Sequence, residues 1–240
     1  MKDHAKAEET EMTIARPGGF GVTNRALEIA NYKMGSRILD IGCGEGDTVD
    51  HLNRIGLDAE GIDINLAKID TAKKEYPDIH VKFGDGGFMD DYMSYTFDGI
   101  ISECALSTMP QPDEALHEAY CVLKKGGRLI ITDYYEKDPE EQQLKAVAIE
   151  AVRQARMPHN EGDCDAGTPS HFTSFCFGGA FFKEPLIRMI EDELGMKVLA
   201  FEDAGIELGP EEIYTEVKTE TAGKKRNLGY FILVAQKAIV

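Results

Sequence analysis

The chain has 240 residues, 42% of them hydrophobic, which is enough to bury a sizeable core as one domain. Its formal net charge of −17 opposes docking on a phosphate backbone, so nucleic acid is not expected as a substrate. The sequence has neither a signal-peptide run near its start nor the ~20 consecutive apolar residues of a membrane span, so we expect a cytoplasmic protein with no membrane partner.

Residues 1–33 are predicted to form a cap segment in front of the main domain, residues 34–240. The charged start of the cap shows no periodicity and predicts a frayed or loosely helical stretch. A turn cluster over residues 16–21 then leads into Thr23, which we predict as the N-cap of a helix that ends near Ala30.

A glycine-rich turn follows a short apolar strand within residues 37–47. The spacing of apolar residues after the turn predicts an amphipathic helix that ends before Gly56. Gly42, Gly44 and Gly46 lie between the strand and the helix. Glycine allows positive φ and removes each Cβ where a ligand approaches the backbone, with the amides of the helix N-terminus just beyond. The turn therefore predicts a nucleotide-handling site.

Asp63 sharpens this prediction, because it lies with the second predicted strand, residues 60–64, about 20 residues further on. A carboxylate there can accept hydrogen bonds from ribose hydroxyls. A dinucleotide site needs a third glycine where this chain has Asp47, and that acid would also repel a pyrophosphate. No G-x-x-x-x-G-K-[ST] run occurs either, so a cationic or neutral nucleoside is the expected ligand.

Helices and strands alternate along the rest of the chain. Helix faces are predicted at Leu66, Ile69, Ala72 and Tyr76, at Leu116, Tyr120 and Leu123 within residues 113–124, and over residues 186–194, and strands over residues 80–83, 97–102, 128–133, 197–202 and 230–236. Such alternation predicts an α/β fold with a parallel sheet and ligands at the carboxyl ends of its strands. Residues 136–182 exceed a direct connection and are predicted as a lid insertion that holds the acceptor.

The pattern Asp40-x-Gly42-x-Gly44-x-Gly46, followed by Asp63 and then Asp85, resembles the class I S-adenosylmethionine-dependent methyltransferases of small molecules. The resemblance covers roughly residues 35–135. It implies a doubly wound, seven-stranded, mostly parallel Rossmann-like sheet with an antiparallel closing strand. It also implies S-adenosylmethionine as cofactor and methyl transfer to a small-molecule acceptor.

The resemblance assigns roles to individual residues. It places the glycine loop under the methionine and ribose parts of the cofactor, Asp63 on the ribose hydroxyls, Asp85 near the adenine amine and the end of the fourth strand beside the methionyl group. N-terminal segments of this kind often fold over the cofactor in the family, although a simple entry loop is an equal reading. The implied cofactor-binding set is Asp40, Gly42, Cys43, Gly44, Gly46, Asp63, Ile64, Asp85, Gly86, Ser102 and Glu103.

Methyl transfer depends mainly on alignment and exclusion of water, and a base is needed only if the acceptor must lose a proton. Candidate catalytic residues are Glu103, Asp133 and His171, with His159 as a further candidate base. Contact with the cofactor's ammonium group or structural pairing explains Glu103 better than a role as base does. A lone histidine such as His171 is more often a packing or surface residue.

The five cysteines have no Cys-x-x-Cys pair, so we expect free thiols with neither a disulfide framework nor a bound metal. Arsenite methyltransferases resemble this fold and grip a soft atom with several cysteines. Cys104, Cys164 and Cys176 are the candidates for such an acceptor site, whereas Cys43 and Cys121 are predicted to be structural. Two other functions stay open: a nucleoside-binding sensor without transfer activity, and an NAD-dependent oxidoreductase, which Asp47 disfavours.

Overall fold

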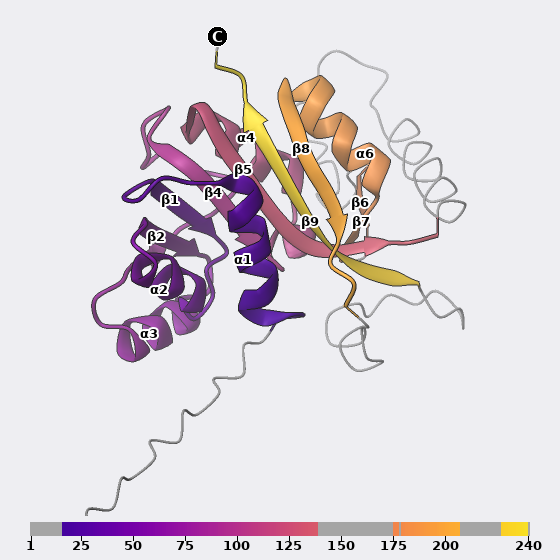
Figure 1. Cartoon of the computed structure of the whole chain (residues 1–240). Helices are drawn as coiled ribbons and strands as arrows, with labels where there is room; N and C mark the ends of the chain where they lie inside the picture. The colour runs from indigo at the N-terminus through magenta and orange to yellow at the C-terminus, as the bar shows by residue number, and fades with distance from the viewer. Residues whose placement is uncertain (1–15, 139–174, 178, 207–226, 240) are drawn as a thin grey trace, which may run out of the picture.

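The computed structural model describes residues 16–138, 175–177, 179–206 and 227–239, and their arrangement is shown in Figure 1. The elements are α1 (Gly19–Ala30), β1 (Arg37–Ile41), α2 (Asp47–Arg54), β2 (Asp58–Asp63), α3 (Leu66–Glu75), β3 (His80–Phe83), β4 (Phe97–Glu103), the short 3-10 helix η1 (Leu106–Thr108), α4 (Pro112–Val122), β5 (Leu123–Glu136), β6 (Cys176–Phe177), β7 (Ala180–Phe181), α6 (Lys183–Arg188), the π-helical turn η2 (Met189–Glu193), β8 (Met196–Asp203) and β9 (Leu228–Lys237). No helix in these ranges is long and apolar enough to cross a bilayer.

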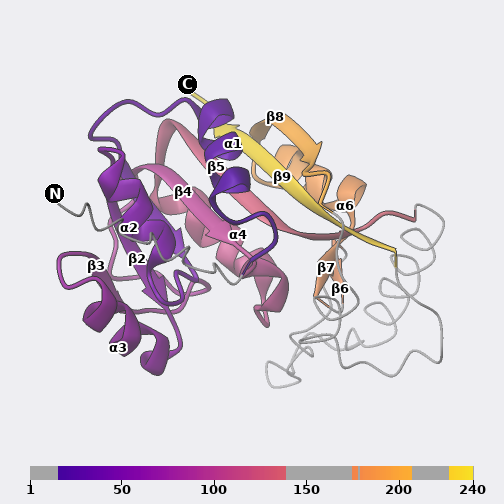
Figure 2. The same ribbon diagram turned by 60° about the horizontal axis from the view of Figure 1, so that its bottom comes forward.

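One mixed sheet organises the fold. Its strands β3, β2, β1, β4 and β5 lie side by side and parallel, and β9 then runs antiparallel between β5 and β8. These seven strands confirm the predicted α/β class and its antiparallel closing strand. Figure 2 shows α2 and α3 beside β2 and β3 at one end of the sheet, far from α6, β6 and β7 at the other.

The hairpin of β6 and β7 was not predicted, and it brings the described sheet to nine strands. It pairs with β5 through Tyr135 and Phe181, beyond the point where β4 ends. This hairpin lies at the end of the predicted lid, residues 136–182. The rest of that segment, from residue 139 to residue 174, lies outside the described residues, so its role as a lid stays a prediction.

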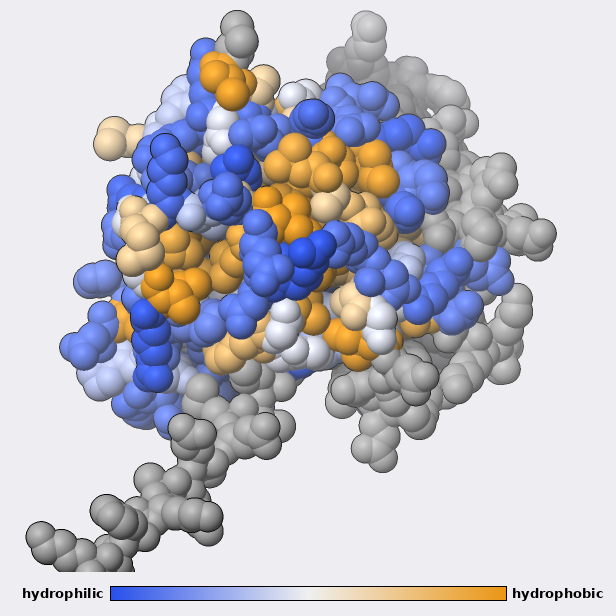
Figure 3. All heavy atoms as spheres, viewed as in Figure 1, coloured by the Kyte–Doolittle hydropathy of each residue, from blue (hydrophilic) through white to orange (hydrophobic). Residues whose placement is uncertain are grey.

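Hydrophobic clusters cover both faces of the sheet. Ile38 and Leu39 are adjacent on β1 and fully buried, and they belong to different clusters because successive side chains of a strand point to opposite faces. The Ile38 cluster takes side chains from α1, α2 and α3, whereas the Leu39 cluster takes them from α4, α6 and η2. Figure 3 shows hydrophobic atoms at the centre of the face beside α1, within a mostly hydrophilic surround.

Several local predictions are confirmed and others are wrong. The third strand has the predicted bounds, and the helix after the glycine turn ends just before Gly56. Thr23 is not an N-cap, because α1 begins at Gly19 and Thr23 is buried inside it. Leu66 is 61% exposed and Cys121 is also exposed, so neither packs inward as predicted. Leu123 is buried but starts β5 and does not belong to the helix.

Candidate active site

The site is built at the carboxyl ends of β1, β2 and β4, where the sequence predicted it. Residues from β1 pair in register with β2 on one side and with β4 on the other. This register brings Asp40, Asp63 and Glu103 to one edge of the sheet, next to the glycine loop that enters α2. Three carboxylates at one edge form an acidic site suited to a cationic ligand.

The three glycines of the loop have different roles. A Cβ on Gly42 would lie 2.3 Å from the Cβ of Ala105, and one on Gly46 would lie 2.6 Å from Cδ1 of Ile79. Both are therefore glycine because the fold packs tightly against them. Gly44 has a φ of +55° and would direct a Cβ into open space, with no atom within 4 Å. The predicted positive φ is confirmed at all three glycines, and among them only Gly44 has open space where a Cβ would lie. The approach of a ligand to this loop stays a prediction.

Asp63 holds the glycine loop in place. Its Oδ2 accepts a hydrogen bond from the amide of Gly44 at 2.8 Å, and its Oδ1 accepts one from the amide of Asn65 at 2.7 Å. Asn65 in turn caps α3. Each carboxylate oxygen keeps a second lone pair, so Asp63 can still accept from the hydroxyls of a ribose. The residue thus shapes the loop and presents acceptors to a ligand at the same time.

Asp85 lies beyond the end of β3, where the adenine-binding acid was predicted. Its Oδ1 accepts from the amide of Gly87 at 2.9 Å. A Cβ on Gly86 would lie 2.7 Å from Cγ2 of Ile41, so this glycine also serves packing. Ile64 and Phe88 are 64% and 66% exposed, and these apolar side chains flank the acids at the ends of β2 and β3. Exposed apolar side chains near a free carboxylate oxygen suit a flat, partly polar base.

Glu103 is enclosed by hydrogen-bond donors. Its Oε1 accepts from Thr23 Oγ1 at 2.9 Å and from Thr132 Oγ1 at 3.3 Å. Its Oε2 accepts from Thr48 Oγ1 at 2.8 Å and lies 3.1 Å from Nη2 of Arg16. Each of its two oxygens therefore already has two partners. The contacts therefore support the structural-pairing reading of Glu103 over that of a base.

Asp40 has different surroundings. It is 2% exposed, and the charged groups that act on it are Glu103, Arg16 and Asp63. Burial raises its pKa well above the ordinary value, the nearby charge of Glu103 raises it further, and Arg16 acts in the other direction. Ser102, another predicted cofactor residue, donates from Oγ to the carbonyl of Ile41 at 2.9 Å and so ties β4 to β1.

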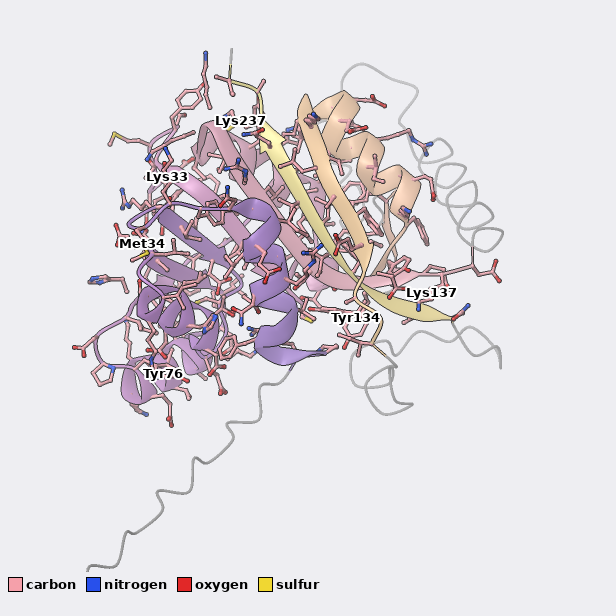
Figure 4. All side chains as sticks on the ribbon, viewed as in Figure 1. Lys33, Met34, Tyr76, Tyr134, Lys137 and Lys237 are labelled. Carbon is pink, nitrogen blue, oxygen red and sulfur yellow. The ribbon has the colours of Figure 1, made fainter. Side chains whose placement is uncertain are left out.

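Asp133, a predicted catalytic residue, is fully buried beneath η1. It accepts hydrogen bonds from the amide of Ser107 at 3.1 Å, from Ser107 Oγ at 2.7 Å and from the amide of Tyr134 at 2.8 Å. Figure 4 shows Tyr134 on the same side of the molecule as the start of α1. These contacts give Asp133 a structural role as the anchor of η1. His159 and His171 lie outside the described residues.

The described cysteines do not gather at one point. Cys43 packs against Gly61, and its thiol pKa is raised by burial. Cys104 has a φ of +50°, and its Sγ shares a hydrogen bond with the hydroxyl of Tyr230 at 3.0 Å. Cys176 lies in the cluster on the opposite face of the sheet from Cys104. Cys164 lies outside the described residues, and the described part of the chain has no group of residues able to hold a metal ion.

Sequence reasoning missed Arg16, Thr48 and Tyr230, which contact the predicted site residues. Arg16 stood in the turn cluster before α1, and Thr48 follows Asp47 in the first turn of α2. Asp47 itself accepts from the hydroxyl of Tyr76 at 2.7 Å, so the acid that replaces the third glycine has a structural partner.

A family model described as "Methyltransferase domain" matches residues 32–174, which is more than half of the chain. This chain belongs to the class I S-adenosylmethionine-dependent methyltransferases. The predicted family is therefore confirmed, and S-adenosylmethionine is the cofactor that the family assigns to the site.

Relatives of this methyltransferase have diverse substrates in their names. It is 29% identical over 100 residues to demethylmenaquinone methyltransferase of Renibacterium salmoninarum, covering 42% of each chain. It is 31% identical over 116 residues to arsenite methyltransferase of Aquipseudomonas alcaligenes, covering 42% of this chain and 33% of the relative. An 18S rRNA (guanine-N(7))-methyltransferase of Mus musculus is 30% identical over 145 residues, covering 55% of this chain and 50% of the relative. The chain thus spans half or less of the length of these relatives.

A solved structure supports the fold over nearly the whole length. The crystal structure of a SAM-dependent methyltransferase from Methanosarcina mazei superposes with a TM-score of 0.59 at 21% identity, covering 89% of this chain and 98% of the other. At this identity the likeness concerns the fold alone.

Proposed function

We propose that this methyltransferase transfers the methyl group of S-adenosylmethionine to a small-molecule acceptor. The observation that carries the proposal is the loop at Gly44, which has an open side and is fixed by Asp63. The residues present fit the cofactor: Asp63 keeps lone pairs for ribose hydroxyls, Asp85 follows β3 and can serve the adenine, and Asp40 is a buried carboxyl at the end of β1.

The cofactor, when bound, supplies an electrophilic methyl group on a positively charged sulfur. The chain's own residues bind and orient it and exclude water, which is the main requirement of such a displacement. Glu103 and Asp133 act in this proposal as structural anchors, because their oxygens already accept several hydrogen bonds. No described carboxylate is therefore assigned as general base, and an acceptor that reacts in its neutral or already ionised form fits best.

The charge of the chain favours a small molecule over RNA as acceptor. A net charge of −17 opposes the phosphate contacts that an rRNA substrate needs. A soft acceptor such as arsenite has less support, because Cys104 and Cys176 belong to clusters on opposite faces of the sheet. Cys43, Cys104 and Cys121 are free thiols, which fits a reducing, cytoplasmic location.

Two measurements test the proposal. Calorimetry with S-adenosylmethionine and with NAD should give saturable binding of the first alone. A screen with methyl-labelled cofactor should then give transfer to a member of a panel of quinols, amines, thiols, arsenite and RNA, with Asp63→Ala as the binding-defective control. Binding without transfer to any acceptor would favour a nucleoside-binding sensor. Transfer to arsenite that is lost in Cys104→Ser and Cys176→Ser would favour the soft-acceptor alternative.

A further inference from the structure

A half-buried apolar cluster lies at the carboxyl edge of the sheet, on the face that α1 covers. Its members are Cys104 directly after β4, Tyr134 near the end of β5, and Ala204 and Ile206 after β8. All four pack against the hydrophobic core of this face, and each keeps part of its surface exposed. We call these four residues the Tyr134 cluster. No role in cofactor binding was predicted for any of them.

The buried residue Tyr230 of β9 connects three members of the cluster. Its hydroxyl shares a hydrogen bond with Cys104 Sγ at 3.0 Å, and its carbonyl accepts from the amide of Ala204 at 2.8 Å. The ring of Tyr134 meets that of Tyr230 edge to face, with centroids 5.4 Å apart and an interplanar angle of 79°. The core thus fixes the position of the cluster and leaves part of the Tyr134 side chain exposed.

The Tyr134 cluster borders the candidate active site. Thr132 joins the two, because its Oγ1 shares a hydrogen bond with the hydroxyl of Tyr230 at 3.0 Å and donates to Glu103 at 3.3 Å. On the other side, Ile206 contacts the turn before α1, where a Cβ on Gly18 would lie 2.6 Å from Cδ1 of Ile206. Figure 4 shows Tyr134 on this side of the molecule. An exposed apolar surface that is continuous with a cofactor site is suited to bind the second substrate.

The side chains of the cluster are uncharged. Burial raises the pKa of the Cys104 thiol, and it raises the pKa of the Tyr230 phenol well above its ordinary value. Both therefore stay protonated near neutral pH, and a protonated thiol is a poor ligand for a soft atom such as arsenic. Asp133 and Glu103 both act on Cys104 as negative charges and would repel an anionic acceptor.

We propose that the Tyr134 cluster binds the acceptor and selects an uncharged aromatic molecule. The exposed part of Tyr134 offers an aromatic surface for a flat ring, and Cys104 and Ile206 add apolar contacts around it. This inference rests on the proposed function, since the cluster serves as an acceptor site only beside a bound methyl donor. It makes Tyr134 and Ile206 residues that determine the specificity for the acceptor.

Calorimetry with three matched probes tests the proposal. Protein saturated with S-adenosylhomocysteine, the demethylated cofactor, is titrated with a naphthol, with the fully hydrogenated decalol and with the corresponding naphthoate. The naphthol should bind, and the other two should bind at least about threefold more weakly. The decalol lacks an aromatic face, and the naphthoate brings a negative charge toward Asp133 and Glu103. Equal binding of either analogue, or no binding of the naphthol, would overturn the inference.

Matched variants separate acceptor binding from a merely structural role. Tyr134→Ala should weaken naphthol binding by about 5- to 20-fold, whereas Tyr134→Phe keeps the ring and should stay within about twofold of wild type. Ile206→Ala should lose about 3- to 10-fold and carries the test if Tyr134→Ala does not fold. Ile239→Ala removes an exposed isoleucine after β9, at the opposite edge of the sheet, and should lose nothing.

The affinity for S-adenosylhomocysteine should be the same in wild-type protein and in all four variants. Equal losses for the naphthol and for S-adenosylhomocysteine in Tyr134→Ala and Ile206→Ala would indicate a structural role and overturn the inference, as would unchanged naphthol binding in both. Wild-type protein that binds neither S-adenosylhomocysteine nor S-adenosylmethionine would instead refute the proposed function.

Discussion

Replacing Gly44 by alanine tests whether the open side of the glycine loop is the cofactor side. At this position the new Cβ would meet no protein atom within 4 Å, so the only cost to folding is the left-handed backbone, with φ at +55°. That cost is about 1–2 kcal/mol for alanine. In a protein of this size it lowers the melting temperature by about 2–8 °C. The variant should therefore fold but bind S-adenosylmethionine at least about tenfold more weakly, because its methyl group takes up ligand space.

Two further variants make the comparison quantitative. Gly35→Ala has the same kind of strain, with φ at +73° and nothing within 4 Å, but lies before β1, at the opposite end of that strand from the loop. It should lose the same few degrees and no affinity. Gly42→Ala adds a 2.3 Å clash with Ala105, and overpacking of about 1–3 kcal/mol on top of the backbone cost should lower the melting temperature by about 4–20 °C.

Thermal melts and calorimetry on the three variants decide the matter. The reasoning would be refuted if Gly44→Ala bound S-adenosylmethionine as tightly as Gly35→Ala does. It would also fail if Gly42→Ala were no less stable than Gly44→Ala, since the contact with Ala105 would then have no energetic weight.

Three other changes have expected outcomes. Asp63→Ala should weaken S-adenosylmethionine binding by about 1–3 kcal/mol in calorimetry, because acceptors for the ribose and the tether to Gly44 are both lost. The pKa of Asp40 is raised in the folded state, so the folded protein favours the protonated carboxyl. The free energy of unfolding therefore falls as the pH rises from the ordinary pKa of an aspartate to the raised pKa. Asp40→Asn should therefore melt higher than wild type at pH 8, with a difference that shrinks toward pH 4, in ligand-free protein. Tyr230→Phe removes the hydroxyl shared with Cys104 and Thr132 and should cost about 1–2 kcal/mol in urea unfolding.

The central strands could be predicted because each is an apolar run buried on both faces, as the strands of a parallel sheet are. The true extent of β5 could not be predicted from the sequence. Residues 124–127 contain two lysines and two glycines, which locally favour a turn, yet the strand begins at Leu123. Leu123 pairs with Phe97, and the register shifts before Gly99, so contacts with another strand override the local preference.

The residues of the candidate site divide in the same way. Some could be predicted from a local motif, and others take their place only through contacts between distant parts of the chain. The acids and glycines could be predicted because a short motif fixes their spacing. Thr23 was predicted as an N-cap from its local context, but its hydroxyl donates to Glu103, 80 residues away. Thr48 donates to the same carboxylate across 55 residues. Only the folded chain brings such hydroxyls together, and their hydrogen bonds to Glu103 favour a structural role for it over that of a base.

The charges at the carboxyl edge explain why this loop suits a sulfonium nucleoside better than a dinucleotide. Among the described residues, the cation that acts on Asp40 is Arg16, which is already paired with Glu103. A pyrophosphate at the start of α2 would add negative charge beside Asp47 and Asp50, which occupy its first turn. A ligand with a positive sulfur and an ammonium group instead lowers the repulsion among the acids. The excess of carboxylates therefore favours a positively charged ligand. The shape of the glycine loop favours a nucleoside.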